Sequence, residues 1–172
     1  MAVKKILTEP NKLLRQVSKS IENIGAQERT LMDDMLDTMY AAQGIGLAAI
    51  QIGIPKRIIV IDISRDQKKK EPRYFVNPII KNRNKIKAKY EEGCLSVPDQ
   101  FAEIERPNTC EVEYLDYEGK KQLLKADGLL ATCIQHEMDH LEGILFIDYL
   151  SKLKKSMIIK KLSKIKVNRE IL

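Results

Sequence analysis

Cysteine is scarce in this sequence, and the few cysteines present do not form pairs. Cys94, Cys110 and Cys133 are the three cysteines among 172 residues. Their odd number and uneven spacing argue against a disulfide framework and favour reduced thiols. The pattern is therefore not typical of a small, disulfide-rich secreted protein.

Long apolar runs are also missing. No stretch approaches the roughly 18 uncharged apolar residues that a transmembrane helix requires. Residues 1–10 contain two lysines and only a short apolar piece, so they lack the long apolar region of a secretory signal. We therefore expect no membrane association, and a cytoplasmic chain that starts near Met1.

The remaining composition is that of a globular protein. Hydrophobic residues make up 44% of the chain and charged residues 31%, which is enough apolar surface for a core and excludes a disordered tail. A length of 172 residues fits one domain and leaves little room for a second. We expect a single domain over residues 1–172.

Hydrophobic spacing predicts a helix near the N-terminus and a buried strand after it. From 23 to 43 the apolar residues recur every three or four positions, the period of an amphipathic helix, and Gly44 is expected to end it. Residues 57–63 are mostly β-branched, which is typical of a strand buried on both faces. The lysine-rich segment 64–73 is expected to be an exposed loop.

Shorter patterns predict antiparallel strands in the middle of the chain. Residues 110–114 alternate, and the turn residues 116–119 lead into the next strand. The expected strands are 74–77, 79–82, 85–90, 101–105, 110–116 and 120–125.

Two further helices are expected after these strands. Asp127 can cap a helix that begins near Gly128 and is buried on more than one side. A last, basic helix at about 151–166 would place one apolar face against the protein, formed by Leu153, Met157, Ile158, Leu162 and Ile165. The predicted fold class is α+β: short, mostly antiparallel strands around a central helix, with an N-terminal helix and a C-terminal helix.

Residues 44–49 match the glycine pattern G-x-G-x-x-A of dinucleotide-binding loops. A pyrophosphate site needs a strand before the glycines and a helix after them. Here a helix precedes and a strand follows. The pattern therefore favours a tight connection, or a place where a substrate chain approaches the backbone closely.

The strongest pattern is H-E-x-x-H at residues 136–140, which contains both histidines of the chain. Positions four apart on a helix lie on one face with Cβ atoms about 6 Å apart, so His136 and His140 can bind one metal ion. Glu137 lies beside the first ligand and can take a proton from metal-bound water. The central helix is therefore expected to bind metal. The alternative is a pair of histidines that satisfy a buried helix without metal.

A catalytic metal of this type usually has three protein ligands and one open position. The acids after His140 are Glu142, Asp148 and Glu170, of which Glu142 lies too near along the helix and Asp148 remains a candidate. Cys94, in an expected loop between strands, competes with Asp148, because a thiolate is the better ligand for a borderline metal.

Three motifs, in this order, resemble those of the peptide deformylase family. They are GIGLAAIQ at 44–51, EGCLS at 92–96 and QHEMDH at 135–140, and the resemblance covers nearly the whole chain. One departure is Ile50, where the family usually has proline just before the glutamine, whereas Gln51 is retained.

The resemblance implies a metal centre and a reaction. Cys94, His136 and His140 would bind one divalent metal, with ferrous iron expected and zinc or nickel also able to occupy the site. The reaction would remove the N-formyl group from the N-terminal formylmethionine of newly synthesised proteins and release formate. Glu137 would be the general base.

The resemblance also implies how transition state and substrate are held. The Gln51 side-chain amide and the Leu95 backbone N–H would stabilise the oxyanion together with the metal. The expected substrate contacts are Gly44, Ile45, Gly46 and Gly93 along the peptide, and Leu129, Thr132, Cys133 and His136 around the methionine side chain.

The net charge of +6 is concentrated at one end of the chain. Residues 151–172 carry eight basic groups and one acid, whereas residues 1–150 carry 22 basic and 23 acidic groups. Such a run is often only a solvated helix face, but the resemblance also implies that this helix docks at the ribosome, whose RNA is a polyanion.

The expected protein is thus a monomeric deformylase with a formylmethionyl peptide as its substrate. Two alternatives stay open. One is a metallopeptidase that hydrolyses internal peptide bonds, and the other is a basic ribosome- or RNA-binding module with a structural metal. Glu137 argues against the second, because a structural site needs no adjacent base and prefers four protein ligands.

Overall fold

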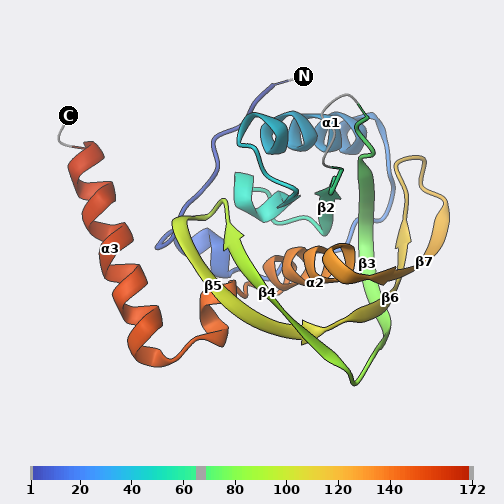
Figure 1. Cartoon of the computed structure of the whole chain (residues 1–172). Helices are drawn as coiled ribbons and strands as arrows, with labels where there is room; N and C mark the ends of the chain where they lie inside the picture. Colours follow the sequence, from blue (N-terminus) through green and yellow to red (C-terminus); the bar gives the residue numbers. More distant parts are fainter. Residues whose placement is uncertain (1, 65–68, 171–172) are drawn as a thin grey trace.

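The chain forms two antiparallel sheets and a buried central helix (Figure 1). The structure, a computed structural model, describes residues 2–64 and 69–170. The larger sheet has the order β1-β2-β3-β6-β7, and the smaller sheet pairs β4 with β5. The α+β class and the antiparallel pairing agree with the sequence-based prediction.

The element bounds are as follows. The strands are β1 (Gly46–Ala48), β2 (Ile58–Ile61), β3 (Arg73–Arg83), β4 (Lys87–Cys94), β5 (Val97–Pro107), β6 (Thr109–Leu115) and β7 (Lys121–Asp127). The helices are α1 (Ala26–Ala41), α2 (Gly128–Leu141) and α3 (Lys152–Glu170), with short 3-10 helices η1 (Lys12–Arg15), η2 (Ala49–Ile52) and η3 (Phe146–Tyr149).

The N-terminal helix is shorter than predicted and does not end on its glycine. α1 covers residues 26–41 instead of 23–43. Gln43 takes the left-handed φ of 56°, and the N–H groups of Gln43 and Gly44 donate to the carbonyls of Tyr40 and Met39. This pair of bonds closes the helix in the way that usually requires glycine at the left-handed position. The expected glycine therefore lies one residue beyond that position.

The middle strands are longer than the sequence indicated. The segments predicted as 74–77 and 79–82 form one strand, β3, with a register shift near Asn77, whose φ is 49°. The Asn77 side-chain amide bonds to both backbone groups of Ile21, at 2.9 and 2.7 Å. β4 and β5 extend to a two-residue turn at Leu95 and Ser96, so Cys94 ends a strand and does not lie in a loop. Long-range pairing of this kind is invisible to local periodicity.

The predicted buried strand and central helix form the core. β2 is inaccessible on both faces, as predicted. α2 packs with β2, β3 and β6 in a cluster whose largest members include Ile59, Ile61, Phe75 and Ile134. Asp127 is the N-terminal cap residue of α2 but makes no side-chain bond to it, so the predicted cap is wrong in this respect. Asp127 is also the last residue of β7 and pairs there with Thr109. Of the loop predicted at 64–73, residues 65–68 lie outside the described part of the chain.

The predicted apolar face of the last helix is only partly used. Leu162 is 4% exposed and packs with Ile158 and Ile159, whereas Leu153 and Met157 are 72% and 62% exposed. The physical reason is visible in Figure 1, where α3 projects away from the body over much of its length. A helical period does not show where a helix leaves the surface. No helix within residues 2–64 and 69–170 is long and apolar enough to cross a bilayer.

Candidate metal centre and cleft

Three potential metal ligands converge from two elements. Cys94 ends β4, while His136 and His140 lie one turn apart on α2. Their ligand atoms all lie within 4.8 Å of one another, and Cys94 Sγ is 3.3 Å from His140 Nε2. One thiol and two imidazoles in a largely buried position fit a four-coordinate divalent transition metal that keeps one place for water or substrate.

Asp148, the competing third ligand, has other partners. Its Oδ2 atom accepts from Arg15 Nη1 at 2.5 Å and from the Leu145 N–H at 3.0 Å, and Lys155 Nζ lies 2.5 Å from Oδ1. Burial acts to raise the pKa of Asp148, but these three donors lower it below its ordinary value. The carboxylate therefore ties α3 to the N-terminal segment and does not reach the histidines.

A buried carboxylate orients the first histidine. Glu92 Oε2 lies 2.9 Å from His136 Nδ1, which leaves Nε2 of the same ring for the metal. Arg106 binds both carboxylate oxygens of Glu92, from Nε at 2.6 Å and Nη2 at 3.0 Å, and its Nη1 donates to Asp139 at 2.8 Å. Such partners fix the tautomer and ring orientation of a metal-binding histidine.

The charges in this network support one another. Burial acts to raise the pKa of Glu92, but hydrogen bonds from His136 and Arg106 lower it below its ordinary value. Burial acts to lower the pKa of Arg106, whereas Glu92 and Asp139 raise it. Glu92 therefore stays ionised and holds the imidazole of His136 in place.

His140 and Glu137 complete the buried polar group. Burial and the neighbouring His136 lower the pKa of His140 well below its ordinary value, which keeps it in the neutral form that binds metals. Burial raises the pKa of Glu137 to about 7. Its Oε2 atom has no hydrogen-bond partner within the described residues, as expected for a group whose partner is water or substrate.

Gly46 allows the chain to pass directly beside Glu137. A Cβ atom at this position would collide with the Glu137 carboxylate and would lie 3.0 Å from Cys133 Sγ. This close approach is made by a side chain of the protein itself, and the close approach of a substrate chain stays a prediction. The dinucleotide interpretation disagrees with the structure, because Gly46 begins β1 and no α-helix follows the glycines directly.

The Gln51 side chain is oriented by its neighbours. Its Oε1 atom accepts the Ala48 N–H at 2.8 Å, so the amide NH₂ group faces the other way. That group donates to Ser96 Oγ at 3.1 Å and lies 3.5 Å from Cys94 Sγ. Ile50, which replaces the usual proline, is fully buried in the core cluster, so side-chain packing holds this turn in place of a ring.

One cleft of about 590 Å³ unites these groups. All of the sequence-predicted site residues except His140 line it, and His140 lies behind His136 with 1% of its surface exposed. Three large apolar side chains on its walls remain partly exposed: Ile45, Leu129 and Phe101 at 43%, 37% and 66%. The predicted residues lining the cleft are Gly44, Ile45, Gly46, Gln51, Gly93, Cys94, Leu95, Leu129, Thr132, Cys133, His136 and Glu137.

Sequence reasoning missed Glu92, Ser96 and Arg106. Glu92 stands inside a recognised motif, but nothing local marks it as the partner of a histidine 44 residues away. Arg106 did leave a signal: in the second half of β5 the buried positions are Ile104 and Arg106, two residues apart. An arginine on the inward face of a strand needs a buried acid, and period-two alternation could have shown this.

Known proteins match both this sequence and this structure. Residues 3–156 match the family model of polypeptide deformylase. The peptide deformylase of Pelagibacter ubique (strain HTCC1062) is 86% identical over 99% of each chain, and that of Rhizobium meliloti (strain 1021) is 54% identical over 95% of this chain and 94% of its own.

Solved structures agree with these sequence matches. A peptide deformylase from Ehrlichia chaffeensis superposes with a TM-score of 0.91 at 42% identity, over 96% of this chain and 97% of its own. A structure of the deformylase from that organism in complex with actinonin superposes with a TM-score of 0.90 at 45% identity, over 95% of this chain and 98% of its own.

Proposed function

The chain belongs to the polypeptide deformylase family, and we propose that the Cys94, His136 and His140 site, with Glu137 as its base, carries out the family's reaction. The protein is an enzyme that removes the N-formyl group from the N-terminal formylmethionine of newly synthesised proteins and releases formate. One observation supports the site assignment above others: Glu137 Oε2, which has no hydrogen-bond partner among the described residues, belongs to a cleft residue that adjoins the cluster of one thiol and two imidazoles.

We propose ferrous iron as the metal, with zinc and nickel as alternatives. Cys94, His136 and His140 would hold the metal, while Glu92 keeps the His136 ring oriented. When bound, the metal lowers the pKa of water and polarises the formyl oxygen. Because intrinsic affinity favours zinc over iron, iron occupancy would reflect availability in the cell.

The proton transfers fall to Glu137. Its carboxylate accepts a proton as water adds to the formyl carbon, and it returns that proton to the amine nitrogen as the C–N bond breaks. The products are formate and a free N-terminal amine. Negative charge on the formyl oxygen would be met by the Gln51 amide, which its bond to Ala48 orients, and by the Leu95 backbone N–H. Donors placed in this way contribute about 3 kcal/mol each.

The substrate would lie in the cleft with its methionine side chain against α2. The cleft that contains Glu137 and Cys94 is also lined by Gly44, Ile45, Gly46 and Gly93, which would offer their backbone groups to the peptide. The three glycines have no side chain, and the side chain of Ile45 is partly exposed. Leu129, Thr132 and Cys133 line the cleft from α2 and would form the wall for the methionine, with Leu129 partly exposed and the other two buried.

A direct test compares formyl-Met peptides with the same peptides lacking the formyl group. We expect formate release from the first and no cleavage of either peptide chain. Metal analysis of protein purified without oxygen, on the same sample, should find about one iron per chain. Cleavage of internal peptide bonds would establish the metallopeptidase alternative, and bound metal without formate release would establish the structural-metal alternative.

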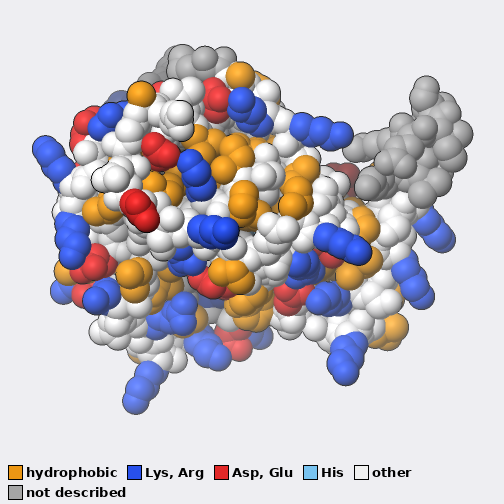
Figure 2. Space-filling view, turned by 180° about the vertical axis from the view of Figure 1, so that it is seen from behind, with side chains coloured by type: hydrophobic (Ala, Val, Ile, Leu, Met, Phe, Trp, Pro, Cys, Tyr) orange, Lys and Arg blue, Asp and Glu red, His pale blue; other side chains and the backbone are white. Residues whose placement is uncertain are grey.

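We also propose a cytoplasmic, monomeric protein of one catalytic domain whose α3 helix docks at the ribosome. Eight basic groups and one acid between residues 151 and 172 support this docking. Lys160, Lys161 and Lys164 are exposed, and Figure 2 shows basic side chains standing out from the described part of α3.

Replacing Lys160, Lys161 and Lys164 with glutamine should weaken binding to purified ribosomes roughly ten-fold. The slope of log affinity against log salt concentration should become less steep by about two to three. This change keeps Leu162, which packs α3 onto the body, whereas deleting residues 154–172 would remove it. Turnover of small formyl peptides should be unchanged. A matched control replaces three exposed lysines elsewhere, Lys5, Lys12 and Lys19. Equal losses in both variants would contradict a specific role for α3.

A further inference from the structure

A second basic surface lies on the body of the protein. Residues 81–89, with the sequence KNRNKIKAK, contain five lysines or arginines and no acid, and all except Ala88 are exposed. The rest of residues 1–150 carry 17 basic and 23 acidic groups. The near-neutral charge of the body therefore conceals one strongly positive segment, which we call the basic corner (residues 81–89).

The basic corner is a fixed part of the fold. Here the chain leaves the five-stranded sheet at the end of β3 and enters the two-stranded sheet at the start of β4. The Asn84 N–H donates to the Thr109 carbonyl at 3.2 Å, and the Asn108 N–H donates to the Ile86 carbonyl at 3.0 Å. Its cations are therefore held on an ordered backbone, which lowers the entropic cost of binding a ligand.

Most of these cations have no carboxylate partner in the part of the chain that the structure describes. Lys89 lies 3.4 Å from Glu103, and the neighbouring Lys125 lies 3.9 Å from Glu111. Lys81, Arg83, Lys85 and Lys87 form no ion pair within the described residues. Unneutralised charges at close spacing produce a positive potential that attracts polyanions.

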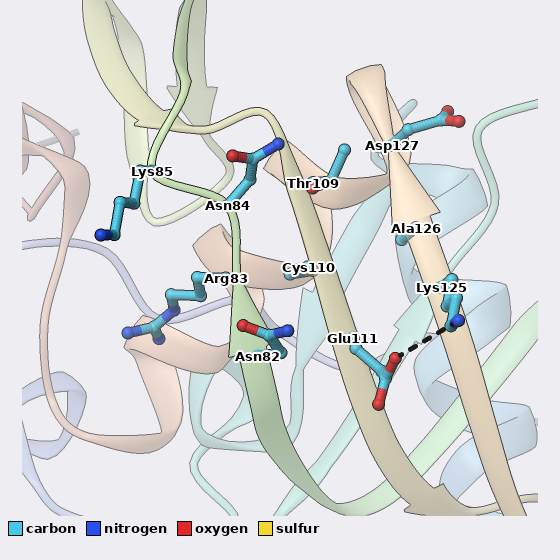
Figure 3. Close-up of a pocket in the computed structure, with 10 residues that line it drawn as sticks. All are labelled: Asn82, Arg83, Asn84, Lys85, Thr109, Cys110, Glu111, Lys125, Ala126 and Asp127. Carbon is cyan, nitrogen blue, oxygen red and sulfur yellow. Dashed lines mark ion pairs between the residues drawn. The ribbon is translucent and has the colours of Figure 1, made fainter.

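A pocket of about 580 Å³ adjoins the basic corner (Figure 3). Figure 3 shows Arg83 and Lys85 projecting to one side of the strand, while Asn82 and Asn84 extend to the other side, toward β6. The lining is polar apart from Cys110 and Ala126. It includes the Thr109 hydroxyl and two acids, Asp127 and Glu111, of which Glu111 lies beside Lys125. Cations beside amide and hydroxyl groups are the combination that contacts phosphates and sugars in nucleic acids.

We propose that the basic corner binds the phosphate backbone of a structured RNA. A lipid surface fits less well, because membrane-binding segments present a broad apolar face and the corner exposes only Ile86 as a large apolar residue. Figure 1 shows the corner on the other side of the body from α3, so the two basic surfaces can act at separate places on one RNA. The proposal does not depend on the deformylation chemistry.

The test uses the full chain and a fluorescently labelled RNA stem-loop, with affinity measured by anisotropy over a series of salt concentrations. Replacing Arg83, Lys85 and Lys87 together with glutamine should weaken binding roughly ten-fold and lower the log–log salt slope by about two to three. The Lys5, Lys12 and Lys19 variant should bind as the unchanged chain does. Deformylation of a small formyl peptide should be unaffected, because none of these residues lines the cleft.

A second measurement needs no substitution. RNA should protect Lys85 and Lys87 of the unchanged chain from acetylation while Lys12 stays reactive. The proposal would be overturned if RNA left Lys85 and Lys87 as reactive as before, or if the corner variant bound RNA as well as the unchanged chain does. Tighter binding to phosphatidylglycerol vesicles than to RNA, abolished in the corner variant, would replace it with a membrane contact.

Discussion

Replacing Glu137 with glutamine is expected to lower turnover of a formyl-Met peptide by roughly 10²–10⁴-fold, while the metal content stays the same. The amide has nearly the same shape as the carboxylate but cannot accept the proton of the attacking water. Because Glu137 is not among the three converging ligands, the metal should remain bound. The measurement is formate release under saturating substrate, with metal quantified on the same preparation.

The matched control for this experiment is Glu142→Gln, five residues further along. Glu142 lies just beyond the end of α2 and pairs with Arg57 at 2.6 Å on the exposed side. The Glu142→Gln substitution should leave turnover close to that of the unchanged chain. Near-normal turnover in the Glu137 variant would rule out its role as the base. Loss of metal in that variant would show that Glu137 belongs to the metal site.

Replacing Cys94 with alanine is expected to weaken metal binding by about 100-fold or more. Losing a residue that only hydrogen-bonds to a metal ligand typically weakens binding by about 10–100-fold, and loss of a ligand itself should cost more. The thiol supplies one of three converging ligand atoms, and the two imidazoles alone leave the site under-coordinated. Competitive titration of the metal-free protein with zinc and a chelator measures this without reference to activity.

Cys110→Ala is the control for the thiol. Cys110 is buried on β6, where it packs in the same core cluster as Ile134 of α2, and it is not among the three converging ligands. It should retain full zinc affinity. Unchanged affinity in the Cys94 variant would mean that another side chain supplies the third ligand, and Asp148 would then have to leave Arg15 and Lys155 to reach it.

Much of the site could be predicted because its motifs are local. His136 and His140 stand four residues apart on one helix, so their shared direction follows from helix geometry alone. The glycines at 44 and 46 predicted the close approach of a substrate chain, which stays a prediction, and the structure adds that Gly46 lies against Glu137. Such relations span a few residues, and the backbone period determines them.

Other parts of the site needed contacts between distant segments. Glu92, Arg106 and His136 come from β4, β5 and α2, and their meeting depends on the register between the two strands. The same is true of β3, whose two predicted pieces join because the Asn77 side chain finds Ile21 across the fold. In each case, no local sequence pattern around one residue predicts which distant residue it will contact.

The sequence by itself determined the α+β class, the helix that carries both histidines and the concentration of charge after residue 150. Local periodicity and composition encode these properties, because each depends on neighbours within one or two turns of the chain. The tertiary structure decided that Cys94 and not Asp148 lies beside the histidines, which way the Gln51 amide faces, and that residues 81–89 form a fixed basic corner. Those outcomes depend on strand register and on packing between segments far apart in the chain, which a single sequence does not display.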